Sequence, residues 1–404
     1  MVLPMKWIIP LLSLCLACGS SSSSDTPDSG PDVTVPPDAT TTLWTEACPA
    51  DTVEFRTIDV GEVSLNVACR GSGPTLVLLH GFPEFWYGWN GVMDQLASKY
   101  RLIVPDQRGY NLSDKPENLE GYEISHLVTD IVGLIDAVSA EPVTVVAHDW
   151  GGAVAWVLAS QHADKVDKLI ILNAPHPDVF ARELANNPAQ QQASFYVQIV
   201  TAPTAETVLS DNDYAFLTMA MGGVVSDEDM VLYKEAWGQP GALTGMVNWY
   251  RANLKDSQLQ IAEPVTVDVP TLVLWGLTDT ALLERNLDGL DEYVSDLTIH
   301  TFEGVSHWIA HEIPETVAEA IDAFVEGTPW TPETTDPPDP PDPPDPPPAA
   351  WVIPDGLVAQ TAPEGKGLPP VTGVKDTSDT AVSAETLVGQ WSVLWFYPLA
   401  STFG

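Results

Sequence analysis

Short and nearly continuous apolar segments recur through the middle of the 404-residue chain. They occupy residues 75–79, 101–104, 143–147, 168–172, 271–275 and 297–301. Stretches with helical character, such as 124–138 and 152–161, lie between them. Apolar strands that alternate with helices are typical of a parallel sheet covered on both faces. The pattern therefore predicts an α/β fold with a mostly parallel sheet and helices on both of its faces.

Two further patterns frame the predicted sheet. Residues 53–58 and 63–68 alternate between apolar and polar side chains around a glycine, which predicts an antiparallel hairpin. Residues 177–263, which precede the last two apolar segments, look helical and aromatic and are predicted to form an inserted cap. A last helix is predicted over 314–325. Together these elements define a folded hydrophobic domain over residues 51–327.

The segments outside this domain have a different composition. Residues 19–50 are mostly Ser, Asp, Pro and Thr, which predicts a disordered tether. Asp-Pro-Pro repeats dominate 328–350, as in an extended, stiff linker. Within 351–404, residues 385–398 resemble the early strand of a thioredoxin-like or peroxiredoxin domain, but the reactive Cys of that family is missing. We interpret this end as a partial domain without activity; an unrelated β-rich tail is the alternative.

The N-terminus is typical of an export signal. An apolar run over residues 7–17 is too short to span a bilayer and fits a signal peptide over residues 1–18. Ala17 and Cys18, followed by a serine tract, resemble a bacterial lipobox, although Cys15 stands where Leu is usual. The resemblance implies lipidation of Cys18 and an anchor at the bacterial cell envelope. Simple secretion, or a cytoplasmic protein with an unusual start, remains an alternative.

Charge and cysteine content restrict the partners further. The formal net charge of −40 argues against nucleic acid and against an anionic membrane surface, which leaves the lipid anchor as the predicted membrane contact. In an exported chain, the pair Cys48 and Cys69 predicts a disulfide, with two free thiols as the alternative. No Cys or His spacing typical of a metal site occurs in the sequence, and we expect neither a metal nor a cofactor.

The strongest chemical signal follows the apolar segment 143–147. Asp149 is flanked by Ala147 two residues before and Gly151 two residues after it. Small residues at this spacing are needed at a sharp turn from strand to helix, where hydrolases present a nucleophile. A carboxylate at this position attacks an sp³ carbon and forms an alkyl ester. The alternative is an Asp that caps the following helix.

Several motifs together resemble the epoxide hydrolase branch of the α/β-hydrolase family. The resemblance covers about residues 53–327, and Asn111 stands where Gly is common. The motifs are His-Gly-Phe-Pro-Glu at 80–84, Pro-Asp-Gln-Arg-Gly-Tyr at 105–110, Ser-Asp-Lys-Pro at 113–116 and His-Asp-Trp-Gly-Gly at 148–152. They occur in the order found in that family.

The catalytic partners of Asp149 follow the last two apolar segments. Asp279 comes just after residues 271–275 and His307 just after 297–301, in the nucleophile–acid–base order of this fold. A His is suited to activate water near neutral pH, and the acid orients it. His300 and His311 are the other candidates for the base, and the Gly-x-x-His-Trp context favours His307. Asp279 as a plain turn residue is the alternative to its role as the acid.

The resemblance also implies how the reacting oxygens are stabilised. The backbone amides of Phe82 and Trp150 would form the oxyanion hole. Tyr196 and Tyr250 of the cap match the tyrosines that donate hydrogen bonds to the epoxide oxygen in this family. A phenol with a pKa of about 10 stays protonated at neutral pH and can act as this acid. Packing within the cap is the alternative for each tyrosine.

The implied activity is hydrolysis of a small apolar epoxide to a vicinal diol through an ester on Asp149. Aromatic residues of the cap are consistent with an apolar pocket, although helix packing explains them equally well. They are Phe195, Tyr214, Phe216 and Trp249.

A haloalkane dehalogenase shares the Asp–His–acid set but often has Asn where this chain has Phe82. A dehalogenase of the fluoroacetate type would carry several Arg residues after the second parallel strand. This chain has Arg108 alone at that place, which is a weak match. A non-catalytic surface protein that keeps the hydrolase fold is an alternative of another class.

Overall fold

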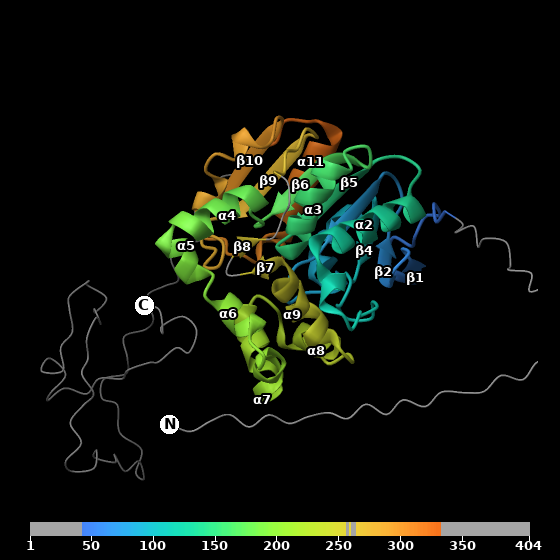
Figure 1. The fold of residues 1–404 in the computed structure, drawn as a ribbon. Coiled ribbons are helices and arrows are strands. Elements are labelled where there is room, and N and C mark those ends of the chain that lie inside the picture. The colour runs from blue at the N-terminus through green and yellow to red at the C-terminus, as the bar shows by residue number, and fades with distance from the viewer. Residues whose placement is uncertain (1–42, 256–257, 260–263, 333–404) are drawn as a thin grey trace, which may run out of the picture. The chain divides into compact units, whose positions relative to one another are not determined.

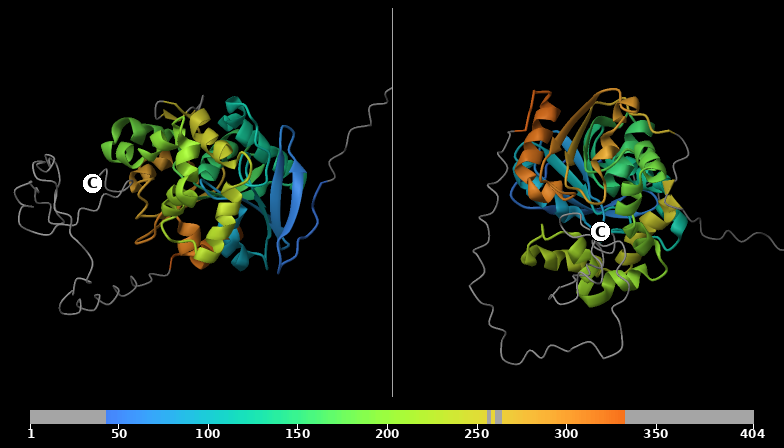
Figure 2. Two further views of the ribbon diagram at one scale, coloured as in Figure 1. Left: turned by 90° about the horizontal axis from the view of Figure 1, so that it is seen from below. Right: turned by 90° about the vertical axis from the view of Figure 1, so that its left-hand side faces the viewer.

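An eight-stranded sheet forms the centre of the protein in the computed structural model, which describes residues 43–255, 258–259 and 264–332 (Figure 1). Its strands are β1 (Glu54–Asp59), β2 (Ser64–Arg70), β3 (Thr75–Leu79), β4 (Arg101–Pro105), β5 (Val143–His148), β6 (Val166–Leu172), β9 (Thr271–Gly276) and β10 (Leu297–Phe302). The spatial order is β1-β2-β4-β3-β5-β6-β9-β10. Strands β4, β3, β5, β6, β9 and β10 are parallel, and β2 pairs antiparallel with β1 and β4. This confirms the predicted mostly parallel sheet, with the hairpin at one edge (Figure 2).

Helices cover both faces of the sheet, which explains the continuous apolar strands. Helices α2 (Ile124–Val138) and α3 (Trp150–Gln161) contribute to one hydrophobic cluster, and α1 (Asn90–Leu96) and α11 (Pro314–Glu326) contribute to the other. Every residue of β5 is buried because β5 lies between these two layers. A strand buried on both faces has no polar side to alternate with its apolar side. The α/β-hydrolase-like layering predicted from the sequence is therefore confirmed.

Among the described residues, six helices lie between β6 and β9 in the chain. They are α4 (Pro177–Asn186), α5 (Pro188–Ala193), α6 (Tyr196–Thr201), α7 (Ala205–Ala220), α8 (Asp227–Trp237) and α9 (Ala242–Asn253). Helices α6 to α9 gather below the sheet in Figure 1. Helix α7 is interrupted at Asp211–Tyr214, where three residues have positive φ. The two-residue strands β7 (Leu254–Lys255) and β8 (Gln258–Leu259) pair after α9. The shorter elements are η1 (Trp86–Trp89), η2 (Leu119–Tyr122), η3 (Glu284–Leu287), η4 (Leu290–Glu292) and α10 (Ile309–Glu312).

Helix α9 of the cap packs directly against the loop that follows β4. A Cβ atom on Gly245 would lie 2.3 Å from the carbonyl oxygen of Gly109, so glycine is needed at this contact. One turn further along, the Trp249 indole donates a hydrogen bond of 2.8 Å to the Arg108 carbonyl. At the end of the helix, the Asn253 amide donates to the Tyr122 carbonyl at 2.7 Å. These contacts fix the position and the rotation of α9 relative to the core.

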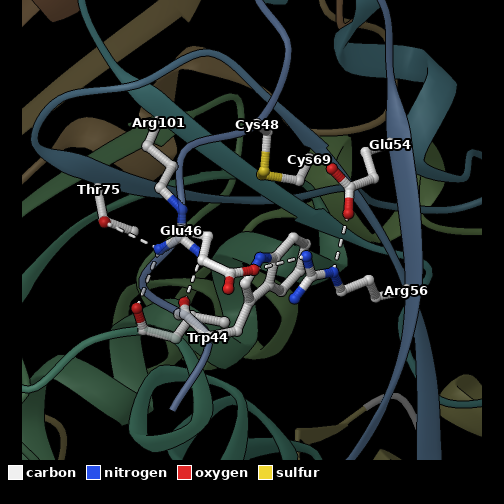
Figure 3. The surroundings of a disulfide bond; sticks show 9 residues. Trp44, Glu46, Cys48, Glu54, Arg56, Cys69, Thr75 and Arg101 are labelled. Atoms are coloured by element: carbon white, nitrogen blue, oxygen red, sulfur yellow. Dashed lines mark hydrogen bonds and ion pairs between the residues drawn. A yellow bond between two sulfur atoms is a disulfide. The ribbon is translucent and has the colours of Figure 1, made fainter. Parts of the chain in front are cut away.

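The packed region begins before residue 51, where the sequence predicted a tether. Cys48 and Cys69 form a disulfide with a Cα–Cα distance of 5.9 Å, which confirms the predicted bond (Figure 3). Trp44 is 5% exposed, and its carbonyl accepts a hydrogen bond of 2.5 Å from Arg101. The disulfide and the buried indole hold residues 43–50 on the domain. At the other end, the packed region extends past the predicted boundary at residue 327, since Trp330 contacts the His300 ring at 5.1 Å.

Several predictions lie outside the described residues. They are the signal peptide over 1–18 with its lipidated Cys18, the first part of the tether, the linker after residue 332 and the thioredoxin-like segment over 351–404. Among the residues that the structure does describe, none of the helices combines the length and apolar character needed to cross a bilayer.

Candidate active site

Asp149 occupies a strained turn between β5 and α3. Its φ of 49° and ψ of −122° lie in a region that side chains other than glycine rarely adopt. Such strain is characteristic of functional turns. A Cβ on Gly151 would lie 2.5 Å from the Leu79 carbonyl oxygen, and one on Gly81 would lie 2.4 Å from Asp149 Oδ1. The small residues around Asp149 are therefore needed to seat its carboxylate close to the loop after β3.

The two carboxylate oxygens of Asp149 face different groups. Oδ1 accepts a hydrogen bond of 2.8 Å from the backbone N–H of Phe82. Oδ2 lies 3.7 Å from Nε2 of His307. Trp150, the other predicted oxyanion residue, is the first residue of α3, where backbone N–H groups have no acceptor within the helix. The site therefore holds one oxygen of Asp149 at a backbone donor and directs the other toward the imidazole.

Asp279 and His307 lie in the loops after β9 and β10 and form a short ion pair. His307 Nδ1 is 2.7 Å from Asp279 Oδ2. The Asp279 side chain is 1% exposed, and its Oδ1 accepts hydrogen bonds from the amides of Ala281 at 2.8 Å and Leu282 at 2.9 Å. Burial alone would raise the pKa of Asp279, but the adjacent His307 and these hydrogen bonds lower it. Asp279 is thus held as an anion that orients one nitrogen of His307.

The surroundings of His307 favour its protonated form. Burial would lower the pKa of the imidazole, but the charge and hydrogen bond of Asp279 and the charge of Asp149 raise it to about 9. The ring therefore carries a proton at neutral pH. Neutralising Asp149 would remove one of the charges that raise this pKa.

Asn173, at the end of β6, holds the acid in place and was not predicted. Its Nδ2 donates a hydrogen bond of 2.8 Å to Asp279 Oδ2, and its Oδ1 accepts one of 2.8 Å from the Gly276 amide. Its φ of 35° lies in the left-handed region, where Asn is more common than other residues with side chains. A polar residue directly after a buried parallel strand was the signal in the sequence that could have indicated it.

The two alternative histidines lie away from Asp149. His300 belongs to β10, and its ring packs against Trp330. His311 belongs to α10 and has Nε2 2.5 Å from Oε1 of Glu84. Among the described contacts of these rings, neither reaches the nucleophile. The geometry therefore favours His307 as the base.

The cap brings Tyr196 and Tyr250 together near Asp149. The Tyr250 ring contacts the rings of Trp150 at 5.0 Å, Phe82 at 5.2 Å and Tyr196 at 6.1 Å. Burial raises the pKa of both phenols, and the negative charge of Asp149 raises them further. Both tyrosines therefore stay protonated and can donate hydrogen bonds to an oxygen bound near Asp149.

The aromatic residues proposed to line a pocket serve in part as packing. Trp249 is 1% exposed, bonded to the Arg108 carbonyl, and in ring contact with Tyr110 at 5.5 Å. Tyr214 lies in the interrupted part of α7 and contacts the ring of Trp237 at 5.8 Å. These contacts join cap to core or cap helix to cap helix.

A second buried polar cluster lies behind His307 and was also missed. His148, just before the nucleophile, has Nε2 2.9 Å from the His307 carbonyl oxygen and Nδ1 3.2 Å from Glu84 Oε2. Glu84 is 3% exposed and also contacts His311 and Tyr233. The position of Glu84 at the end of the His-Gly-Phe-Pro-Glu motif was its signal in the sequence. Its partners come from distant segments and had no local signal.

Comparisons with known proteins agree with this geometry. A family model described as alpha/beta hydrolase fold matches residues 74–314. The chain is 42% identical over 280 residues to the AB hydrolase superfamily protein YfhM of Bacillus subtilis, covering 67% of this chain and 97% of that protein. It is 36% identical over 286 residues to Epoxide hydrolase 1 of Caenorhabditis elegans, covering 67% and 70% of the two chains.

A solved structure gives the same result. The crystal structure of Bacillus megaterium epoxide hydrolase in complex with an inhibitor superimposes with a TM-score of 0.63 at 31% identity, covering 68% of this chain and 100% of that one. The matched family model, the curated relatives and this structure all point to the same group. The chain therefore belongs to the α/β-hydrolase fold family and, within it, is a hydrolase of the epoxide hydrolase type.

Proposed function

We propose that this enzyme opens a small apolar epoxide with Asp149 and hydrolyses the resulting ester to a vicinal diol. One observation carries the proposal. The carboxylate of Asp149 has Oδ1 on the Phe82 amide and Oδ2 toward His307, beneath the buried Tyr250 and the half-buried Tyr196, both protonated. An attacking oxygen, a base for water and two donors for a leaving oxygen thus meet at one point.

In the first step Oδ2 of Asp149 attacks an epoxide carbon. The Oδ2–carbon bond forms while the carbon–oxygen bond of the epoxide breaks, and the oxygen takes a proton from Tyr196 or Tyr250. Fixed donors aimed at the developing negative charge stabilise it without reorganisation. The strained backbone at Asp149 holds the carboxylate in this direction before the substrate arrives.

The protons balance within the site. At rest, the imidazolium of His307 faces the carboxylate of Asp149 at 3.7 Å, and its pKa is raised to about 9 partly by that charge. Ester formation neutralises Asp149, so the pKa of His307 falls and the ring releases a proton. That proton replaces the one that the tyrosine gave to the product hydroxyl. His307 therefore becomes a base only after the ester has formed.

In the second step neutral His307 removes a proton from water, and the hydroxide attacks the ester carbonyl. The carbonyl oxygen is Oδ1, which already accepts the hydrogen bond from the Phe82 N–H, and the Trp150 N–H is its second predicted donor. The bond from the carbonyl carbon to Oδ2 then breaks, and the departing alkoxide takes the proton of the newly added hydroxyl. The diol leaves with Oδ2, and the oxygen of the water stays on Asp149. Asp149 is again a carboxylate and His307 again an imidazolium, as in the resting site.

Two contacts argue against dehalogenation as the main activity. The Phe82 side chain, which offers no donor for a halide, packs on the Tyr250 ring at 5.2 Å. Arg108 is buried in a bidentate pair with Asp130 at 2.6 and 2.7 Å and does not face a substrate. A purely binding role has no use for the strained nucleophile and the ion-paired base. Epoxide opening uses all of these groups.

The test measures two products from the full-length protein. We expect diol from styrene oxide or another member of an aliphatic, aromatic and terpene epoxide panel, and no halide from a bromoalkane. The matched control is Asp149→Asn, which should abolish diol formation. Halide release without diol from the whole panel would replace this proposal with a dehalogenase.

A further inference from the structure

The carboxylate of Glu84 joins four elements that all bear on the active site. It follows β3 two residues after Phe82, whose amide holds the nucleophile. Its Oε2 lies 3.2 Å from Nδ1 of His148, the residue that precedes Asp149. Its Oε1 lies 2.5 Å from Nε2 of His311 on α10. The same Oε1 lies 3.1 Å from the hydroxyl of Tyr233 on α8 of the cap. The residue is almost fully buried, so each of these partners offsets the cost of burying its charge.

His148 transmits this arrangement to the catalytic base. Its Nε2 is 2.9 Å from the backbone carbonyl oxygen of His307, and the two rings lie 4.6 Å apart. Both ring nitrogens of His148 face oxygen atoms, so the ring links the Glu84 carboxylate to the backbone of His307. The backbone position of His307 therefore depends on His148, and that of His148 depends on Glu84.

On the cap side, α8 is bonded to the same loop at two consecutive residues. The Tyr233 hydroxyl donates to Glu84, and the Trp237 indole donates a hydrogen bond of 2.6 Å to the Pro83 carbonyl. Tyr233 and Trp237 are four residues apart and lie on one face of α8, as their ring distance of 5.8 Å shows. This face of α8 thus holds the loop that also supplies the oxyanion amide of Phe82.

Packing alone does not hold this part of the cap. A cavity of about 220 Å³ follows the boundary between α8 and the core, and Tyr87, Asp229, Tyr233 and His311 are among the residues that line it. The Tyr87 hydroxyl donates a hydrogen bond of 2.6 Å to Asp229 across the same cavity. Since the boundary is hollow here, hydrogen bonds between α8 and the core contribute more to its position than they would in a close-packed interface.

We propose that Tyr233 and His311 are positioning residues that couple the seating of cap helix α8 to the alignment of His307, through Glu84 and His148. Loss of the Tyr233 hydroxyl frees one side of Glu84, and the displacement passes through His148 to the backbone of His307. The inference rests on the proposed roles of Asp149 and His307. It assigns the cap a part in hydrolysis of the ester, in addition to the part of Tyr196 and Tyr250 in forming it.

The test resolves the two chemical steps by rapid quench under single-turnover conditions, following the ester on Asp149 by mass spectrometry. In Tyr233→Phe we expect the alkylation rate to stay within about twofold of the parent enzyme and the rate of ester hydrolysis to fall about tenfold. A correctly placed base accelerates a reaction by about a hundredfold or more, and a displaced His307 loses part of this acceleration. The matched control is Tyr100→Phe, which removes a hydroxyl that donates a hydrogen bond of 2.7 Å to Asp322 on α11 and has no described contact with α8 or Glu84. It should leave both steps within about twofold of the parent values.

A second pair of variants tests His311. His311→Leu should slow ester hydrolysis about tenfold, whereas His311→Gln keeps an N–H donor near Glu84 and should remain within about threefold of the parent rate. Thermal unfolding of each variant identifies one that does not fold. If His311→Leu fails to fold, the two tyrosine variants decide the question alone.

The outcomes separate this inference from the proposed function. Parental ester hydrolysis in Tyr233→Phe, or equal slowing in Tyr100→Phe, would overturn the coupling while leaving the two-step mechanism intact. If no ester forms on Asp149 in the parent, in any variant or in His307→Gln, the proposed mechanism fails and the coupling fails with it.

Discussion

The core and the cap hold their parts of the active site in different ways. In the core, Asp149, Asp279 and His307 are fixed by polar contacts, such as the 2.7 Å pair between the last two and the 2.8 Å bond from the Phe82 amide. In the cap, the Tyr250 ring packs against the rings of Trp150 at 5.0 Å and Tyr196 at 6.1 Å, in addition to hydrogen bonds among these side chains. The core set is held mainly by ion pairs and backbone donors, whereas the position of the cap tyrosines also depends on how rings and helices pack.

This difference separates two parts of the chemistry. In the proposed mechanism, the core set forms and hydrolyses an ester on Asp149 for any leaving group. The choice of an epoxide rests on Tyr196 and Tyr250, which the cap delivers. Substitutions in the core should therefore block ester hydrolysis, and substitutions in the cap should change alkylation or the coupling between the two steps.

The largest expected effect comes from Asp279→Asn in the core. An amide at this position no longer stabilises the imidazolium and favours the wrong tautomer of His307, so ester hydrolysis should slow by about a thousandfold or more. Single-turnover kinetics should show the ester accumulating on Asp149. The matched control, Asp288→Asn at an exposed site, should behave as the parent enzyme. Fast ester hydrolysis in Asp279→Asn would show that Asp279 does not orient the base.

Tyr250→Phe tests the cap with an intermediate effect. Removing one of two donors to the leaving oxygen should slow alkylation by about ten- to a hundredfold and leave ester hydrolysis unchanged. Tyr214→Phe, another cap tyrosine whose ring packs on Trp237, is the matched control and should not change alkylation. Rapid kinetics with unchanged alkylation in Tyr250→Phe would remove Tyr250 from the reaction and weaken the assignment to epoxides.

The smallest effect is expected for Gly245→Ala, which disturbs how the cap sits on the core. The added methyl group would meet the Gly109 carbonyl oxygen at 2.3 Å, so α9 must move and the free energy of unfolding should fall by about 1–3 kcal/mol. Alkylation should slow several-fold because Tyr250 moves with α9. Chemical denaturation and single-turnover kinetics measure the two changes. A variant with parental stability and alkylation would mean that the close contact does not set the cap position.

The sheet and the strained turn at Asp149 were predictable because their signals are local. Strand β5 is buried along its whole length, and the apolar run at 143–147 shows this directly. The turn at Asp149 needs small neighbours, and these are adjacent in the sequence. Asn111, the departure from the family pattern, has a φ of 38°, which Asn tolerates nearly as Gly does. The departure therefore leaves the turn intact.

The residues that sequence reasoning missed depend on contacts between distant segments. Asn173 reaches Asp279 because β6 pairs with β9, which places residues 106 positions apart side by side. Tyr233 meets Glu84 across 149 positions and only after the cap has folded. Trp44 lies in a segment whose composition resembles the tether, and its burial depends on the disulfide and on Arg101. In each case the partner lies far away in the sequence, so local sequence patterns do not indicate which two residues will meet.

The most direct test of the account is the mass of the protein after His307→Gln is mixed with an epoxide that the parent enzyme hydrolyses. Without the base, the ester should persist, so the intact mass should rise by the mass of one epoxide and peptide mapping should place the adduct on Asp149. The control, Asp149→Ala in the same background, should show no adduct. Continued epoxide consumption by His307→Gln with no adduct on Asp149 would contradict the nucleophile assignment on which the mechanism rests.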